Sequence, residues 1–144
     1  MLFQNILVPV NLSHQSARAF KVALDIAKKR NSKITILTCI DTYACHHLYY
    51  QIRVNSKQIK EQTKVVKKHF EKLESLAKKN NISVRSKILT SESVFNDIVT
   101  FAKSRKHDLI VIGSHGRTGF DKWLLGSVAN GVSQKAKCPV LIVK

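Results

Sequence analysis

The sequence predicts an α/β fold in which a doubly wound, Rossmann-like parallel sheet of five strands, in the order 3-2-1-4-5, carries helices on both faces. Short runs of apolar and β-branched residues predict the strands, at residues 2–10, 33–40, 82–90, 108–113 and 139–143. The segments between them carry apolar residues at helical spacings of three and four. Right-handed crossovers between parallel strands place such helices on both faces of the sheet. We expect residues 1–144 to form a single domain.

The first strand and the first helix follow directly from the pattern. Residues 2–10 form a compact apolar run, which is typical of a strand buried on both faces. Ser13 is a favoured N-cap residue, and residues 28–30 are all basic, as in the last turn of a helix. Apolar residues recur between these ends with helical spacing, at Ala17, Phe20, Leu24 and Ala27.

The middle of the chain predicts a second strand, a loop and a long helix. Residues 33–40 are β-branched and apolar, which favours a strand. Residues 41–55 show no clean period, so we expect a loop over the surface. From Ser56 to about Asn80 an apolar helical stripe returns, made of Ile59, Val66, Phe70, Leu73 and Ala77. Lysines occupy another face of this helix, which we expect to be solvated, at Lys57, Lys60, Lys64, Lys68 and Lys72.

The last third predicts the remaining strands. Residues 82–90 alternate as a strand at the edge of the sheet, and a helix follows over about 92–104. Residues 108–113 predict a fully buried strand, a helix runs over about 127–136, and residues 139–143 form the fifth strand. If strands one and four are neighbours where the winding reverses, Asn11 and the glycine-rich stretch after Ile112 face one crevice.

Composition limits the classes of partner and compartment. The chain has 25 Lys+Arg against 9 Asp+Glu, a formal net charge of +16, so anionic partners such as nucleotides, nucleic acid or an anionic surface are favoured. Its longest aliphatic runs span only 109–112 and 140–143, far short of the roughly 20 residues that a membrane span needs. The N-terminus does not resemble a signal peptide, and an odd number of cysteines without C-x-x-C spacing fits a reducing compartment. We therefore expect a cytoplasmic protein with free thiols.

The glycine-rich stretch from Gly113 to Ser127 carries the strongest chemical signal. Gly113 and Gly116 allow the backbone to turn tightly and to approach a ligand closely. Gly126 and Ser127 open a helix, whose free N–H groups and positive dipole end suit a phosphate, and the Ser127 hydroxyl adds a donor. The spacing matches neither a P-loop nor the dinucleotide fingerprint. A turn that only connects strand and helix remains the alternative from the residues alone.

The spacing of these glycines resembles the universal stress protein family, over essentially the whole chain. Its ATP-binding members carry Gly, two residues, Gly, nine residues and then Gly-Ser or Gly-Thr. Gly113, Gly116 and Gly126-Ser127 match that pattern, with residues 117–125 as the nine. Residues 6–10 (Ile-Leu-Val-Pro-Val), Ser13 and Ser16, and the ending at 138–143 are also similar to that family.

The resemblance implies an ATP site at named positions. The backbone around Gly116, Gly126, Ser127 and Val128 would hold the phosphates, with Gly113 near the ribose and the backbone of Ile40 against adenine. The complete set of expected cofactor-binding residues is Pro9, Val10, Asn11, Ser13, Ile40, Gly113, Ser114, His115, Gly116, Arg117, Gly126, Ser127 and Val128. Asn11 departs from the family, whose ATP-binding members usually have Asp there to accept hydrogen bonds from the ribose. Asn keeps one acceptor and loses the charge, and we expect binding to survive because a carboxylate near phosphates is repulsive.

Other reactive residues have alternative interpretations. Arg117 and Lys122 either pair with phosphate oxygens or remain solvated. His115 could approach a phosphate, but no carboxylate in the motif is placed to orient a water, so we assign no catalytic residue. Residues 45–47 (Cys-His-His) lack the spacing of a zinc site, and we expect no protein metal site, with Mg²⁺ arriving on the nucleotide phosphates. Phe120 and Trp123 favour packing over base stacking.

The sequence therefore predicts an ATP-binding regulatory or sensor protein of stress response. The alternatives are a basic dimeric interaction or nucleic-acid-binding module that holds no nucleotide, and a slow ATPase. Nucleic acid is disfavoured because no helix-turn-helix, zinc-finger or aromatic strand motif is present. Residues Val140–Val143 should form an apolar edge strand, and pairing with a second copy would make a homodimer, as the family resemblance also implies. The lysine-rich helix over 56–80 could bind an acidic protein partner.

Overall fold

The structure is a computed structural model that describes residues 2–47, 50–115 and 125–144. Its main sheet has five parallel strands in the order β5-β2-β1-β6-β7, which confirms the predicted order 3-2-1-4-5. These strands are β1 (Asn5–Pro9), β2 (Lys33–Asp41), β5 (Val84–Ser91), β6 (Leu109–Gly113) and β7 (Val140–Val143). β1 lies between β2 and β6, with Ile6 opposite Ile34 on one side and Leu109 on the other.

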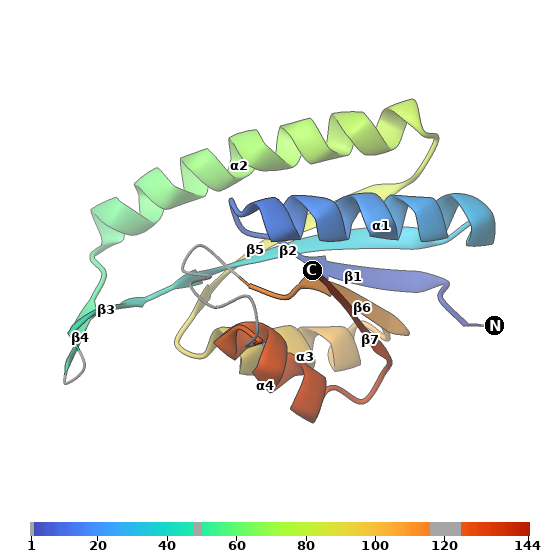
Figure 1. Ribbon diagram of the computed structural model, residues 1–144. Coiled ribbons are helices and arrows are strands. Elements are labelled where there is room, and N and C mark those ends of the chain that lie inside the picture. Colours follow the sequence, from blue (N-terminus) through green and yellow to red (C-terminus); the bar gives the residue numbers. More distant parts are fainter. Residues whose placement is uncertain (1, 48–49, 116–124) are drawn as a thin grey trace.

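The helices cover both faces of this sheet, as Figure 1 shows. α1 (His14–Arg30) and α2 (Ser56–Lys79) lie on one face, and α3 (Val94–Ser104) and α4 (Ser127–Lys135) lie on the other. Ser13 caps α1 as predicted, because its Oγ accepts a hydrogen bond of 3.2 Å from the Ser16 amide. Asn55 and Gln58 form a capping box that begins α2.

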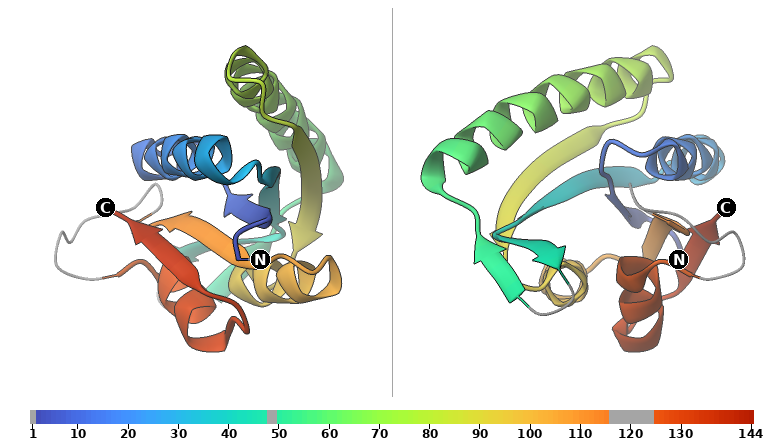
Figure 2. Two further views of the ribbon diagram at one scale, coloured as in Figure 1. Left: turned by 90° about the vertical axis from the view of Figure 1, so that its right-hand side faces the viewer. Right: turned by 60° about the vertical axis from the view of Figure 1, so that its left-hand side comes forward.

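Two parts of the predicted secondary structure are wrong. The first strand begins at Asn5 rather than residue 2, since Phe3 has a left-handed φ of 67°, which a strand residue does not adopt. Residues 41–55 are not only a loop, because β3 (Tyr43–His47) and β4 (Tyr50–Arg53) pair as an antiparallel ribbon. Figure 2 shows this ribbon projecting away from the main sheet. A ribbon outside the layered core needs no regular apolar period, which is why the sequence pattern missed it.

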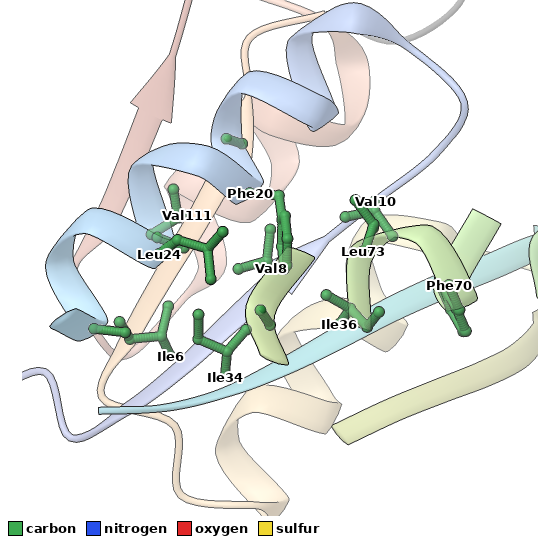
Figure 3. Packing of buried hydrophobic residues seen from close by; sticks show 14 of the residues in the cluster. Ile6, Val8, Val10, Phe20, Leu24, Ile34, Ile36, Phe70, Leu73 and Val111 are labelled. Carbon is green, nitrogen blue, oxygen red and sulfur yellow. The ribbon is translucent and has the colours of Figure 1, made fainter. Parts of the chain in front are cut away.

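The core is divided between the two faces because side chains alternate along each strand. On the α1 and α2 face, Ile6, Val8 and Ile36 pack with Phe20 of α1 and Phe70 of α2 (Figure 3). On the other face, the core consists of Leu7, Leu37, Ile98, Ala102, Ile110, Ile112, Ala129 and Val132. Fully burying one such large side chain contributes about 1.5–3 kcal/mol, so the strands are fixed from both sides.

The sheet reverses its winding between β1 and β6. α1, which follows β1, lies on one face, whereas α4, which follows β6 along the chain, lies on the other (Figure 1). Ligands of doubly wound sheets bind beyond the carboxyl ends of the strands at such a reversal. The fold therefore places a crevice where Pro9 and Gly113 end their strands. No helix in the described ranges is long and apolar enough to cross a membrane.

Candidate functional site

A cavity of ≈ 290 Å³ lies at this reversal point. We call it the cleft. Most of the predicted site residues line it, namely Pro9, Val10, Asn11, Gly113, Ser114, His115, Gly126, Ser127 and Val128. Its wall combines the ends of β1 and β6 with the start of α4, three segments that are distant in sequence. The fold thus brings together both the Pro-Val-Asn turn and the described part of the glycine motif.

The remaining predicted residues lie elsewhere. Ser13 caps α1 beside the cleft without lining it. Ile40 is buried and lines a neighbouring cavity of ≈ 430 Å³ between the end of β2 and α2, which shares Asn11 and Cys39 with the cleft. Gly116 and Arg117 fall outside the described residues, as do Phe120, Lys122 and Trp123.

The N-terminus of α4 opens onto the cleft without a capping side chain. Its N-cap is Gly126, no side chain caps it, and the first turn contains no acidic residue. The first backbone bond of the helix runs from the Asn130 amide to the Gly126 carbonyl at 2.8 Å. The preceding amides of Ser127, Val128 and Ala129 have no partner within the helix, and all three residues line the cleft. With the partial positive charge of a helix N-terminus, this arrangement suits an anion.

Two backbone hydrogen bonds fix this end of α4 against the sheet. The Gly126 amide donates to the Ser114 carbonyl at 2.7 Å, and the Ser114 amide donates to the Val143 carbonyl at 2.8 Å. The first of these bonds links the two ends of the glycine motif, at Ser114 and Gly126. The free amides of α4 are therefore held relative to β6 and β7.

His115 lines the cleft, and one of its two ring nitrogens makes no hydrogen bond to a described residue. Its Nδ1 lies 3.0 Å from Ser114 Oγ. Its Nε2 is buried and has no hydrogen-bond partner in the part of the chain that the structure describes. A buried polar atom without a partner costs about 1–3 kcal/mol, so a ligand that pairs with Nε2 would recover free energy.

Asn11 is held in an Asx turn at the mouth of the cleft. Its Oδ1 accepts a hydrogen bond of 2.8 Å from the Ser13 amide. Ser16 Oγ donates to the Asn11 carbonyl at 2.7 Å and accepts from the Asn11 amide at 3.1 Å. This network does not use Asn11 Nδ2, which is a hydrogen-bond donor. An aspartate at this position would have a second acceptor oxygen in its place.

Gly113 serves close packing rather than an unusual backbone conformation. A Cβ atom on Gly113 would lie 2.8 Å from both the carbonyl carbon and the Cβ of Gln15, in the first turn of α1. No glycine in the described ranges has a positive φ. The tight turn expected at Gly113 is therefore not seen, whereas its close approach to a ligand stays a prediction, since Gly113 lines the cleft. Its small size lets α1 approach the end of β6.

An apolar wall completes the cleft, and sequence reasoning missed it. The wall is formed by Leu37 and Cys39 of β2, Val94 and Ile98 of α3, Ile112 and Ala129. Burial, with a smaller effect of the Asp97 carboxylate, raises the pKa of the Cys39 thiol to about 12, so this thiol stays protonated near neutral pH. Val94 and Ile98 share one face of α3 at a spacing of four, but only the tertiary fold shows that this face meets β2.

The described lining of the cleft contains no charged carboxylate, lysine or arginine side chain. Among the described residues, no group of three His, Cys, Asp or Glu side chains is placed to hold a metal ion, and the side chains of residues 45–47 fall outside that set. The positive potential that the described lining supplies therefore comes from backbone dipoles, and the apolar wall supplies an uncharged surface.

A doubly wound parallel sheet with an uncapped helix N-terminus at its switch point is typical of the α/β proteins that bind anionic ligands there. The family model described as "Universal stress protein family" matches residues 2–144. Universal stress protein MJ0531 of Methanocaldococcus jannaschii is 33% identical over 145 residues, covering 99% of this chain and 83% of that protein. The chain therefore belongs to the universal stress protein family.

Solved structures agree with this assignment. Universal stress protein UspA from Lactobacillus plantarum has a TM-score of 0.87 at 23% identity and covers 100% of this chain and 99% of its own. A universal stress protein in complex with cAMP has a TM-score of 0.75 at 23% identity, covering 100% and 99% of the two chains. The universal stress protein from Archaeoglobus fulgidus in complex with dAMP has a TM-score of 0.71 at 24% identity, with both chains covered completely. At these identities the likeness establishes the fold.

Proposed function

We propose that this protein binds ATP in the cleft and acts as a nucleotide-dependent regulator or sensor in stress response. The observation that carries this proposal is the N-terminus of α4, which ends in free amides at the cleft with neither a capping side chain nor an acidic first turn. By contrast, side chains cap α1 and α2, and α3 has Asp97 in its first turn. Among the described helices, α4 is the one whose N-terminus is left open in this way, and its first three residues line the cleft.

The phosphates would lie at this helix end. The amides of Ser127 and Val128 and the Ser127 hydroxyl would donate to phosphate oxygens, and the helix dipole adds roughly half a positive charge. His115 Nε2, buried without a partner in the described residues, would supply a further polar contact. Gly116, which the family resemblance assigns to the phosphates, remains part of the proposed set, as does Arg117, whose guanidinium would pair with phosphate oxygens.

The apolar wall suits the adenine base. Leu37, Cys39 and Ile98 offer an uncharged surface for a flat ring. Contact with these side chains would compensate for the water that the ring loses on binding. Two structurally similar family members are in complex with dAMP and with cAMP, both of which contain adenine and a sugar phosphate. ATP shares that portion, so these complexes support an adenine nucleotide here.

Magnesium would be held through the nucleotide phosphates. The described lining of the cleft offers no carboxylate ligand, and Mg²⁺ prefers oxygen ligands and retains several waters. Hydrolysis by a slow ATPase would need a group that orients the attacking water. A turnover measurement with Mg-ATP separates this alternative from a nucleotide-held switch.

The apolar edge of the sheet supports a homodimer. β7 lies at one edge of the sheet, and Leu141 is 39% exposed there. An uncovered edge strand presents unpaired backbone groups, which a second β7 related by a two-fold axis would satisfy. A second proposed partner is an acidic protein, which would bind the exposed lysines of α2.

The test is to purify the protein without added nucleotide, denature it with heat and identify the released small molecules by chromatography and mass spectrometry. We expect ATP or ADP near one equivalent per chain, or, from an empty preparation, binding of added Mg-ATP by calorimetry. An empty protein that also fails to bind Mg-ATP would contradict the proposal. That result would favour the alternative of a basic interaction module without nucleotide.

A further inference from the structure

A third cavity lies at the amino ends of the strands, away from the cleft. Its volume is ≈ 700 Å³, and it is lined by the first residues of β1 and β2, by residues 83 and 85–87 in and before β5, and by the end of α3 with the turn after it. Four of its lining residues are cationic, Lys33, Arg85, Lys87 and Arg105, and none of the lining residues is acidic. We call this cavity the basic groove.

The cations of β5 occupy a face of the sheet that is normally apolar. In the register of the sheet, Arg85 lies beside Thr35 of β2 and Lys87 lies beside Leu37. The side chain of Leu37 packs into the core under α3 and α4, so Arg85 and Lys87 belong to that face. Leu89, two residues further along β5, also packs into that core. Positions on a sheet face that a helix layer covers are usually apolar, and β5 changes from apolar to cationic within one strand. All four cations of the groove are exposed.

The opposite wall of the basic groove is held in place by aromatic contacts. The Arg105 guanidinium carbon lies 5.8 Å from the centre of the Phe101 ring, a cation–π arrangement. The rings of Phe101 and His107 stack with centroids 5.7 Å apart and an interplanar angle of 23°. A guanidinium that is already positioned loses less conformational freedom when it binds an anion.

His107 adds a buried polar group to this wall. It is 9% exposed, and its Nδ1 has no hydrogen-bond partner among the described residues. Burial is the main cause that lowers the pKa of His107; Arg105 lowers it further, while the Ala102 carbonyl and Asp108 oppose the shift. The Asp108 carboxylate accepts hydrogen bonds of 2.9 Å from the amides of Gln4 and Asn5, and Asp108 does not line the groove.

We propose that the basic groove binds a small molecule that carries at least two phosphoryl groups, at a site separate from the cleft. Four like charges around one cavity repel each other, and a ligand with several negative charges would remove that repulsion. Two of the four are arginines, whose planar donors match phosphate oxygens in pairs. The groove is on the other end of the sheet from the ends of β1 and β6, so both sites can be filled together.

The first test measures binding of inorganic pyrophosphate by calorimetry at low salt, in a Gly126→Asp background whose new carboxylate blocks the start of α4 in the cleft. A double variant, Arg85→Gln with Lys87→Gln, should bind pyrophosphate about tenfold more weakly or worse, because it loses charge-assisted hydrogen bonds. The matched control is Arg18→Gln with Lys21→Gln, which removes the same charges from exposed positions on α1, on the opposite face of the sheet. The control should change the affinity by less than about twofold, given the screening of distant surface charges. An equal loss in both variants, or no binding at all, would overturn the proposal.

The second test places the ligand in the groove by a local signal. The side-chain nitrogen resonances of His107 are titrated with pH, with and without pyrophosphate. A bound anion beside Lys33, Arg85, Lys87 and Arg105 should raise the pKa of His107, because the positive imidazolium then gains an attractive neighbour. An unchanged pKa at saturating pyrophosphate would contradict a site in this groove. Because this signal comes from His107 alone, it reports on the groove even if the cleft binds no ATP.

The same signal separates two sources of phosphoryl groups. Titration with ADP in a cleft-blocked background, Gly126→Asp, is compared with titration by pyrophosphate. Equal responses would assign recognition to the phosphoryl groups alone, and a tighter response to ADP would assign an organic phosphate as ligand. A His107 signal that responds to neither would overturn the proposal, whatever the cleft is found to bind.

Discussion

The amide of Gly126 donates a 2.7 Å hydrogen bond to the carbonyl of Ser114 and so closes the glycine motif at its base. Ser114 is in turn bonded through its own amide to Val143 at the end of β7. The free amides at the start of α4 are therefore positioned by the sheet itself. A site organised in this way should respond separately to changes in its scaffold, in its proposed ribose contact and in its proposed phosphate contact.

Gly113→Ala should destabilise the protein. The added Cβ would lie 2.8 Å from backbone and Cβ atoms of Gln15, so either α1 or β6 must shift. Overpacking of this kind typically costs about 1–3 kcal/mol. Chemical denaturation measures the free energy of unfolding, and a value equal to that of the unmodified protein would show that α1 is free to move away.

Asn11→Asp should tighten the binding of ATP relative to inorganic triphosphate. Asp keeps the acceptor for the Ser13 amide and replaces the Nδ2 donor by a second acceptor for a ribose hydroxyl. A hydrogen bond to a charged group contributes about 1.5–3 kcal/mol, part of which repulsion from the phosphates offsets. Calorimetry with both ligands measures the ratio of affinities. A ratio that does not change would place the ribose away from residue 11.

The alternation of strands and helices along the chain and most helix ends could be predicted because they depend on local patterns, whereas the strand order in the sheet was predicted from the doubly wound class. The hydroxyl group of Ser13 favours the N-cap position in any helix, and the apolar run at 109–112 predicts a buried strand without knowledge of its neighbours. The cleft residues that follow from the motif, such as Ser127, could be predicted for the same reason. Leu37 and Val94 could not, because their roles depend on which faces of β2 and α3 meet.

Two further features needed tertiary information. Within the described residues, β3 and β4 form a two-stranded sheet separate from the main sheet, and the period rules that locate the layered strands do not apply to it. The reason for Gly113 depends on the approach of Gln15, about a hundred positions earlier in the chain. The cationic face of β5 is visible in the sequence as Arg85 and Lys87, but the groove exists only once the end of α3 stands opposite.

The stability of the protein should fall as the pH decreases through about 6.5. Burial lowers the pKa of both His69 and His107 in the folded state from the ordinary value of 6.5. Below pH 6.5 these two histidines bind protons in the unfolded chain, whereas in the folded protein they stay neutral to a lower pH. Protonation therefore favours unfolding. Above about pH 7.5 both states are neutral and this dependence vanishes.

Unfolding midpoints in denaturant, measured between pH 8 and pH 5, test this dependence. His107→Gln removes one of the two groups and should reduce the slope of stability against pH below 6.5. A slope that survives unchanged when both His69 and His107 are replaced by Gln would assign the effect to other groups.

Leu141→Lys should convert the proposed dimer to monomers. Leu141 is exposed on the edge strand β7, and a charge placed there opposes pairing with a second copy. Light scattering after size exclusion should report twice 16.3 kDa for the unmodified protein and 16.3 kDa for the variant. A mass of 16.3 kDa for the unmodified protein at micromolar concentration would contradict the dimer.

The most direct test of the proposed nucleotide site is the binding of Mg-ATP to the Gly126→Asp variant. Gly126 has φ −60° and ψ 155°, a conformation that a capping aspartate adopts without strain. The new carboxylate would accept hydrogen bonds from the free amides of α4 and so stabilise the helix by about 0.5 kcal/mol. It would also occupy the position proposed for the phosphates. We predict that the unfolding temperature is maintained or raised and that the affinity for Mg-ATP measured by calorimetry falls at least about 100-fold. An unchanged affinity in a folded variant would show that the N-terminus of α4 does not hold the phosphates.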